Sequence, residues 1–427
     1  MIVLITSRRS FFMLNRMVTL FIFLALFLLI DAYVFQAVLN VSKDWSPLWK
    51  QVVRIGFWVP TLISITGLLW WMFSDPYKGT DYLRIYVLAG AAILYFSKLF
   101  AVLFLFVDDL QRGVRWIANY FSTREPNLPG ETITRSEFLS KAALVASAVP
   151  LGLAAYGVIS GAHDYRIKRI SLKLPNLPRS FDGIRIGQIS DIHSGSFWNK
   201  RAVKGGVEMM MKEKPDLIFF TGDLVNNESS EVKEYIPIFE KLKAPLGVFS
   251  ITGNHDYGDY HQWPTSEIKR KNFADLIEAH RLLGYDLLMN ENRTIKLNGD
   301  QLAIIGIENW GAGRFSKYGK LDQAYRGIEE ASTKILLSHD PTSWDAIVRP
   351  NYRDIDLTLS GHTHGFQFGV EIANIKWSPC QYVYKQWGGL YQEDDQYLYV
   401  NRGFGYLGYP GRIGMPPELT IIELKRG

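Results

Sequence analysis

The chain contains a run of 20 residues without a single charge, from Ile55 to Ser74. An α-helix rises about 1.5 Å per residue, so a run of this length crosses the hydrocarbon core of a bilayer. Trp70 and Trp71 stand near one end of the run, where aromatic side chains anchor a helix at the membrane interface. Lipid offers no hydrogen-bond partner to the backbone, so a segment of this kind must be a helix.

Three further segments are nearly as apolar. Together with the first run they predict an all-helical membrane region at residues 1–163, with four transmembrane helices at about 17–39, 55–74, 85–107 and 142–162. The last segment has no charge but is rich in Ala, Gly and Ser and contains Pro150, so a buried core helix is the alternative there.

Two of these segments are each interrupted by one charge. Asp31 lies in the segment at 17–39, and Lys98 lies in the segment at 85–107. A charge in lipid is costly unless it has a partner or faces a polar cavity. The two spans run in the same direction and the charges lie at similar depth, so we predict that Asp31 and Lys98 form a pair. The alternative is that each side chain slides to an interface.

The distribution of positive charge gives an orientation. Residues 108–141 form the most basic connecting segment, which the positive-inside rule places in the cytoplasm. We therefore expect a multi-pass protein of the cell membrane with an extracytoplasmic C-terminal domain. The segment Thr134–Lys141 also resembles a twin-arginine export signal in which Ser136 replaces the second arginine. The arginines of the N-terminal tail, Arg8, Arg9 and Arg16, favour the opposite orientation.

Composition excludes several other classes of protein. Residues 1–163 carry 14 Lys and Arg against 9 Asp and Glu, whereas the remainder carries 33 of each. The whole net charge of +5 therefore belongs to the membrane region, and we expect no nucleic-acid binding. Cys380 is the single cysteine, which excludes an intrachain disulfide and a cysteine-based zinc site.

Residues 164–427 have the pattern of a soluble α/β domain. Short apolar strands alternate with charged segments that read as helices at Lys200–Lys214, Ser229–Lys243 and Lys271–Leu283. After Gly365 the sequence becomes rich in strands and aromatic residues.

Five strands of this domain end in short polar segments that contain five of the eight histidines. The segments are Asp191-Ile-His193, Gly222-Asp223, Gly253-Asn254-His255-Asp256, Ser338-His339-Asp340 and Gly361-His362-Thr-His364-Gly365. Strand ends are where α/β proteins build their sites. Carboxylate, amide and imidazole ligands suit Mn, Fe, Zn or Mg, and the lack of thiolates argues against Cu(I) and iron–sulfur clusters. Two such cations with a bridging aspartate are suited to hydrolysis of a phosphate ester or anhydride.

The order and spacing of these segments resemble the calcineurin-like metallophosphoesterases, in particular a membrane-anchored bacterial subgroup. The separations are 30 residues from His193 to Asp223, 31 from Asp223 to Asn254 and 23 from His339 to His362. The resemblance covers roughly residues 165–424 and implies a four-layer sandwich in which two β-sheets are flanked by helices.

The resemblance also implies roles for single residues. Asp191, His193, Asp223 and His364 would bind one metal, and Asp223, Asn254, His339 and His362 would bind the second. His255 would contact the phosphate and stabilise or protonate the leaving group, and Asp256 would orient that region. Both are therefore our candidate catalytic residues, and Mn is the favoured metal, with Fe, Zn and Mg as alternatives.

The chain departs from the family pattern at two positions. Asn226 stands where many members have an aspartate that supports the catalytic histidine, which puts the protonation state of His255 in doubt. Phe366 replaces the second glycine of the closing motif, where it either shapes the leaving-group pocket or packs.

Other polar and aromatic residues have ordinary interpretations. We expect His163, His261 and His280 to be surface or packing residues, and Arg402 and Arg412 either to bind substrate or to form structural salt bridges. The aromatic run Trp377, Tyr382, Tyr384 and Trp387 is expected to pack on the sheet, and a substrate cage is the alternative.

The sequence thus predicts a membrane-bound hydrolase with a binuclear metal centre. Its substrate would be a phosphodiester, phosphomonoester or pyrophosphate, either a phosphorylated small molecule or a phospholipid-like, lipid-linked or envelope compound. The resemblance favours this because bacterial relatives include enzymes that cleave the pyrophosphate of UDP-2,3-diacylglucosamine. The alternative is a catalytically silent membrane receptor or scaffold, against which the intact ligand set argues.

Overall fold

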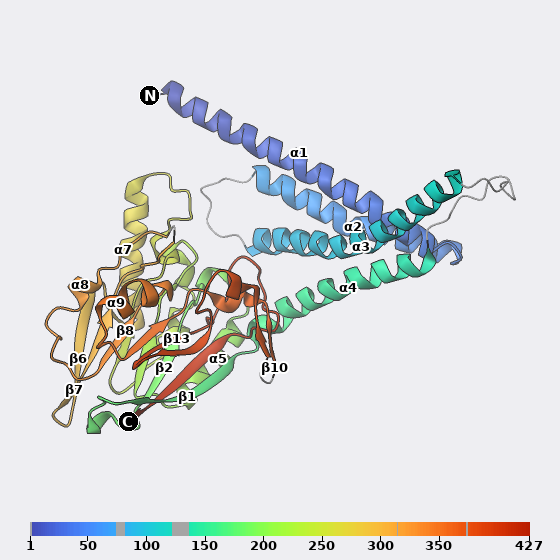
Figure 1. Cartoon of the computed structure of the whole chain (residues 1–427). Helices are drawn as coiled ribbons and strands as arrows, with labels where there is room; N and C mark the ends of the chain where they lie inside the picture. Colours follow the sequence, from blue (N-terminus) through green and yellow to red (C-terminus); the bar gives the residue numbers. More distant parts are fainter. Residues whose placement is uncertain (1, 74–81, 122–135, 314, 373–374) are drawn as a thin grey trace. The chain divides into compact units, whose positions relative to one another are not determined.

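The computed structural model describes residues 2–73, 82–121, 136–313, 315–372 and 375–427. The chain divides into two compact units, with the division after Ala155, and each unit is considered by itself. Figure 1 gives the labels of the helices and strands.

The N-terminal unit is built from four helices, α1 (Ile2–Val41), α2 (Pro47–Phe73), α3 (Tyr82–Phe121) and α4 (Glu137–Ile159). By length and composition they hold four candidate membrane spans, at Met17–Val41, Pro47–Phe73, Ile85–Phe121 and Glu137–His163. The four predicted spans are therefore confirmed as apolar helices. The third is longer than predicted, because α3 continues past Val107 to Phe121 through a segment that contains no proline.

A buried ion pair and two hydrogen bonds to its carboxylate join the first three helices. Lys98 of α3 donates to Oδ1 of Asp31 of α1, and both side chains are almost completely buried. Oδ2 of Asp31 accepts hydrogen bonds from the hydroxyl groups of Thr61, at 2.7 Å, and Tyr95, at 2.6 Å. The predicted pairing of Asp31 with Lys98 is confirmed, and the carboxylate has the partners that a charge in an apolar bundle needs.

Breaking this pair should destabilise the helix bundle. In Lys98→Ala the Asp31 carboxylate stays buried without its cation, and the loss of one partner from a buried pair costs about 3–5 kcal/mol. Thermal unfolding of the purified protein in detergent measures the effect. Lys43→Ala is the matched control, since Lys43 forms an exposed pair with Glu137 at 3.5 Å, and such pairs contribute about 0–1 kcal/mol. Equal shifts in the two variants would contradict the stabilising role of Asp31–Lys98.

The C-terminal unit contains two six-stranded sheets. The first has the order β1-β14-β2-β3-β4-β5, with strands Arg166–Leu174, Glu418–Arg426, Arg185–Ile189, Leu217–Phe220, Val248–Ser250 and Asp286–Leu287. The second has the order β12-β13-β9-β8-β7-β6, with strands Gly389–Glu393, Gln396–Val400, Leu357–Ser360, Lys334–Leu337, Asp300–Gly306 and Glu291–Leu297. A separate two-stranded sheet pairs β10 (Val370–Ile372) with β11 (Ile375–Trp377).

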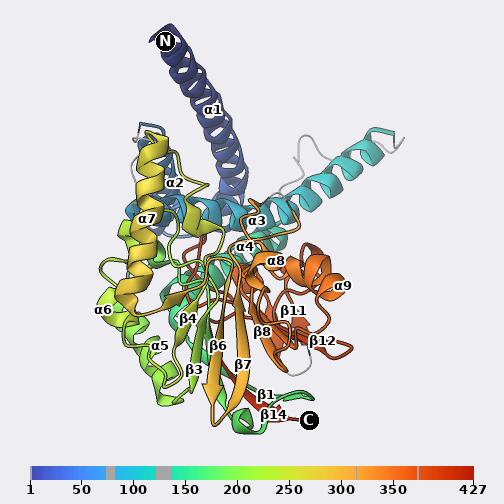
Figure 2. The ribbon, with the colours of Figure 1, turned by 90° about the vertical axis from the view of Figure 1, so that its left-hand side faces the viewer.

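Helices cover the outer face of each sheet (Figure 2). Helices α5 (Lys200–Lys212), α6 (Ile236–Phe239) and α7 (Ser266–Leu283) pack on the first sheet, and α8 (Leu321–Ala324), the π-turn Trp344–Val348 and α9 (Arg349–Asn351) pack on the second. Between the sheets lies a core of fully buried side chains that includes Phe219, Leu302 and Leu359. This arrangement confirms the four-layer α/β sandwich.

One predicted helix is wrong. The segment Ser229–Lys243 contains a 3₁₀ turn at Ser229–Val232 and only one turn of α-helix at Ile236–Phe239. Pro237 explains the interruption, because it has no N–H to donate to the carbonyl of Lys233 and is tolerated only in the first turn of a helix, where it lies in α6.

Candidate metal centre

The site lies where strands of both sheets end. In the first sheet β2, β3 and β4 run parallel, with Ile186 paired to Leu217 and Ile218 to Val248, so their carboxyl ends share one edge. In the second sheet β8 and β9 are parallel as well. Hydrogen bonds link the two sheets at the site. The backbone N–H of His362, after β9, donates to both carboxylate oxygens of Asp191, after β2, at 2.9 and 3.0 Å.

Five of the seven predicted ligands have left-handed backbone conformations, with φ between 48° and 72°: Asp191, His193, Asp223, His362 and His364. Such conformations are uncommon outside glycine and cost roughly 1–3 kcal/mol each, so they persist where the surroundings impose them. Their concentration at these strand ends turns the side chains inward and marks the site as one under functional constraint.

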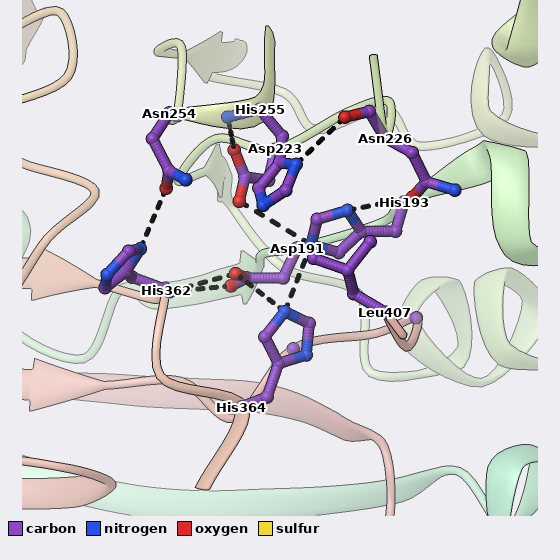
Figure 3. A network of polar contacts seen from close by, with 12 residues as sticks. Asp191, His193, Asp223, Asn226, Asn254, His255, His362, His364 and Leu407 are labelled. Atoms are coloured by element: carbon purple, nitrogen blue, oxygen red, sulfur yellow. Dashed lines mark hydrogen bonds and ion pairs between the residues drawn. The ribbon is translucent and has the colours of Figure 1, made fainter. Parts of the chain in front are cut away.

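The structure brings the predicted ligands together in two groups, Asp191–His193–His364 and Asp223–His339–His362, and in each the candidate ligand atoms lie within 4.8 Å of one another. In the first group Nε2 of His364 lies 3.0 Å from Nε2 of His193 and 3.3 Å from Oδ1 of Asp191. Figure 3 shows these side chains converging on one space.

Asp223 links the two groups. Its Oδ2 atom lies 3.5 Å from Nε2 of His193 and 3.1 Å from Nε2 of His339. Its Oδ1 atom accepts the backbone N–H of His255 at 2.9 Å, which fixes the carboxylate. One carboxylate placed between two sets of imidazoles has the position required of a ligand shared by two cations.

Asn254 belongs to the second group through its amide oxygen. Oδ1 lies 2.8 Å from Nδ1 of His362 and 3.2 Å from Nε2 of His339. The amide Nδ2 donates to the hydroxyl of Tyr260 at 3.0 Å, which turns the oxygen toward the histidines. All seven predicted ligands therefore surround a common space.

The protonation of the histidines suits metal binding. Burial lowers the pKa of His193 to about 3 and that of His362 to about 4, and it holds the pKa of His364 well below its usual range. These imidazoles are neutral at pH 7, as a metal ligand must be. At His339 burial also lowers the pKa, but the carboxylate of Asp223 outweighs it and raises the pKa to about 10, so a cation bound there would displace a proton.

Hydrogen bonds outside the site fix which ring nitrogen faces it. Nδ1 of His339 donates to the carbonyl of Thr221 at 2.7 Å, and Nδ1 of His193 donates to Oδ1 of Asn226 at 3.1 Å. In both rings Nε2 is left for the metal, a common arrangement in metal sites.

Asn226 also contacts His255. Its backbone carbonyl, not its side chain, accepts the hydrogen bond from Nδ1 of His255 at 2.9 Å. The orientation of His255 therefore does not require an aspartate at this position. Nε2 of His255 is the ring nitrogen available to a substrate.

Asp256 supports the backbone of the site. Its buried carboxylate accepts four backbone N–H groups at 2.8–3.3 Å, those of Asp223, Leu224, Val225 and Gly253. These bonds join the loops after β3 and β4. This geometry agrees with the orienting role expected of Asp256 and makes it a positioning residue.

Sequence reasoning missed three residues around His362 and Asn254. The hydroxyl of Tyr384 lies 2.9 Å from Nε2 of His362, and Oδ2 of the buried Asp340 lies 3.6 Å from the same atom. Tyr260 holds Asn254, as described above. Asp340 directly follows a ligand and could have been suspected, whereas Tyr260 and Tyr384 carry no distinctive signal.

Arg402 and Arg412 are structural. Both are buried, and Arg402 forms ion pairs with Glu371 and Glu418. Arg412 donates to several backbone carbonyls, among them that of Gly405 at 2.9 Å, and its Nη2 lies 3.2 Å from Nδ1 of His364. Of the two expected roles, the structure favours the structural one.

The remaining histidines pack as expected: His163 against Trp198, His261 against Trp263, and His280 through a hydrogen bond to Ser250. The expectation for the aromatic run holds only at its end. Trp387 is buried, but Trp377 and Tyr382 are exposed and Tyr384 reaches the site.

The contact between Asn226 and His193 yields a prediction. Asn226→Ala should lower metal affinity about 10–100-fold, the usual effect of losing a partner of a metal-binding histidine. Asn226→Asp keeps an acceptor for His193 and should retain the affinity. Competition with a fluorescent metal chelator measures both variants. Equal, undiminished affinities would show that this hydrogen bond does not orient the ligand.

Comparisons with known proteins give two matching family models and several relatives. Residues 184–366 match the model of the calcineurin-like phosphoesterases, and residues 15–162 match one described as a probable calcineurin-like phosphoesterase transmembrane domain. An uncharacterised metallophosphoesterase of Bacillus subtilis, YkuE, is 32% identical over 301 residues, which cover 69% of this chain and 98% of the relative. The chain belongs to the calcineurin-like metallophosphoesterase family.

Other members of the family share the membrane region. A transmembrane protein with a metallophosphoesterase domain from Bos taurus is 26% identical over 391 residues, covering 88% of this chain and 81% of the relative. Among solved structures, the phosphopantetheinyl hydrolase of Mycobacterium tuberculosis is 13% identical, with a TM-score of 0.30 over 52% of this chain and 89% of the other.

Proposed function

We propose that this metallophosphoesterase hydrolyses a phosphate ester or anhydride through a binuclear centre of divalent metal ions at a membrane. The observation that carries the proposal is the position of Asp223 between two histidine groups, each completed by further ligands. The alternative of a silent receptor or scaffold explains neither the complete ligand set nor its left-handed backbone conformations.

The ligands fit divalent metals, since they comprise carboxylate, amide and neutral imidazole groups. When bound, two such ions would supply Lewis acidity and lower the pKa of a water molecule. His255 would donate from Nε2 to the phosphate or to the leaving-group oxygen, while the Asn226 carbonyl keeps its ring in place. We favour Mn, with Fe, Zn and Mg as alternatives.

We propose a membrane-associated substrate, phospholipid-like or otherwise lipid-linked, because the catalytic unit is carried on a chain with four candidate spans. A screen of the full-length protein in detergent tests the activity, with each of the four metals against a nitrophenyl phosphomonoester, a nitrophenyl phosphodiester, a nucleotide-linked pyrophosphate and a phospholipid. We expect metal-dependent release from at least one class. No turnover with any metal would favour the silent scaffold.

We also propose that the catalytic unit is extracytoplasmic, in line with the basic segment at 108–141. A cysteine in place of exposed Lys296 should then react with a membrane-impermeant maleimide in intact cells. The natural Cys380 gives little background, because burial raises the pKa of its thiol to about 12. Labelling of position 296 only after lysis would reverse the orientation.

A further inference from the structure

The two-stranded sheet exposes apolar side chains at its free end. Ile372 of β10 and Ile375 of β11 are cross-strand partners, and they are 68% and 66% exposed. This sheet is separate from both six-stranded sheets, so neither isoleucine contributes to their core (Figure 1). Paired aliphatic side chains left in water at the end of a hairpin indicate a surface that contacts another apolar phase.

The two isoleucines are part of a larger apolar face. It comprises Phe368, Ile372, Ile375, Trp377, Tyr382 and Val383, all of them exposed. The rings of Phe368 and Trp377 meet edge to face at 6.2 Å, and Nε1 of Trp377 lies 3.5 Å from the hydroxyl of Tyr382. Aromatic residues with one polar atom beside aliphatic ones are typical of a surface at the membrane interface.

Two residues that adjoin the apolar face in the sequence, Phe366 and Tyr384, lie beside the metal centre. Phe366, two residues after the ligand His364, is 44% exposed, and its ring meets that of Tyr384 edge to face at 6.4 Å. The hydroxyl of Tyr384 in turn lies 2.9 Å from Nε2 of His362. Phe366 and Tyr384 therefore connect the sequence neighbours of the face with the candidate ligand His362.

The same face is bonded to the end of a candidate membrane span. The span Glu137–His163 finishes inside the C-terminal unit, where the carbonyl of Gly157 accepts the N–H of Arg412 at 3.1 Å. The next residue, Ile413, bridges to Phe368, and its carbonyl accepts the N–H of Gly369 at 2.9 Å. Two consecutive residues thus connect the last turns of the span with the segment that leads into β10, and this continuity with a candidate membrane span favours the bilayer as the occupant of the face.

We propose that the apolar face docks on the lipid bilayer that holds the four helices. The isoleucines of the hairpin enter the acyl-chain boundary, and Trp377 and Tyr382 lie at the level of the headgroups. Resting on the proposed function, this assigns to the metal centre amphiphilic phosphates whose acyl chains remain in the membrane while the phosphate reaches the metals past Tyr384.

Quenching by lipid tests this docking in the full-length protein. A cysteine at Ile372, or in a second variant at Ile375, is labelled with an environment-sensitive fluorophore, and the protein is reconstituted into liposomes that contain spin-labelled phosphatidylcholine. Lys296→Cys on the polar hairpin β6–β7 is the matched control. We expect quenching at 372 and 375 at least twice that at 296. Quenching no greater than at 296 overturns the proposal, and cross-linking of two copies through position 372 would assign the face to a second copy instead.

Hydrolysis provides a separate readout. The double variant Ile372→Asp with Ile375→Asp should lower turnover of a liposome-embedded phosphate ester at least tenfold more than turnover of a soluble nitrophenyl ester. Equal losses of turnover with the embedded and the soluble ester would contradict the proposal that the apolar face presents the substrate. Because quenching requires no catalysis, a protein that docks but hydrolyses nothing refutes only the proposed function.

Discussion

In His255→Ala we expect hydrolysis to fall about 10²–10⁴-fold while both metal sites stay intact, because a group that donates a proton or stabilises charge contributes on this order. The ring of His255 is held by the carbonyl of Asn226 and is not a member of either ligand group. The loss should shrink for nitrophenyl esters, whose leaving group needs little protonation. Rates are measured over a series of esters with leaving groups of different pKa.

The control for this variant is His261→Ala. His261 is a nearby histidine whose ring packs on Trp263 and lies 3.6 Å from Glu228, outside the ligand groups. It should change the rate less than twofold. If the parent and His255→Ala show the same dependence on leaving-group pKa, His255 is not the proton donor, and full activity with both metals bound would refute its role altogether.

Asp223→Ala should have the largest effect of any single substitution at the metal centre. Its carboxylate lies between both histidine groups, so its removal weakens two sites at once. We expect metal affinity to fall by more than about 10²-fold, the upper range for loss of an outer partner, and hydrolysis to be lost. Calorimetric titration of the apo-protein measures the affinity.

Asp286→Ala is the matched control for Asp223→Ala. Asp286 pairs at the surface with Arg293 at 2.8 Å and is remote from the ligand groups in the sequence and in its contacts. Its metal affinity should equal that of the parent. A variant lacking Asp223 that still binds two ions tightly would mean that another group bridges the metals.

The membrane helices and the ligands could be predicted for a shared reason. Each depends on a pattern that is local in the sequence, either a charge-free run such as Ile55–Ser74 or a strand that ends in a polar segment such as Asp191–His193. Even the pairing of Asp31 with Lys98 follows from depth along parallel spans. Such patterns specify which elements exist and which side chains lie at their ends.

The partners of the ligands could not be predicted in this way. Tyr260 and Tyr384 reach Asn254 and His362 from irregular segments, and their contacts depend on loop paths that no periodicity encodes. At Asn226 the important atom for His255 is a backbone oxygen, which every residue type carries. The sequence also predicts that Trp377 and Tyr382 pack on the sheet, and both are exposed, because aromatic residues have the same composition signal on a surface as in a core.

If the proposed function is right, two divalent ions act together in one chain. Titration of Mn into the metal-free, full-length protein, with hydrolysis of a phosphodiester followed at each addition, tests it most directly. With Asp223 shared by both ligand groups, we expect the rate to rise to a plateau at two equivalents of metal per chain. A plateau at one equivalent, or a rate independent of added metal, would contradict the binuclear centre.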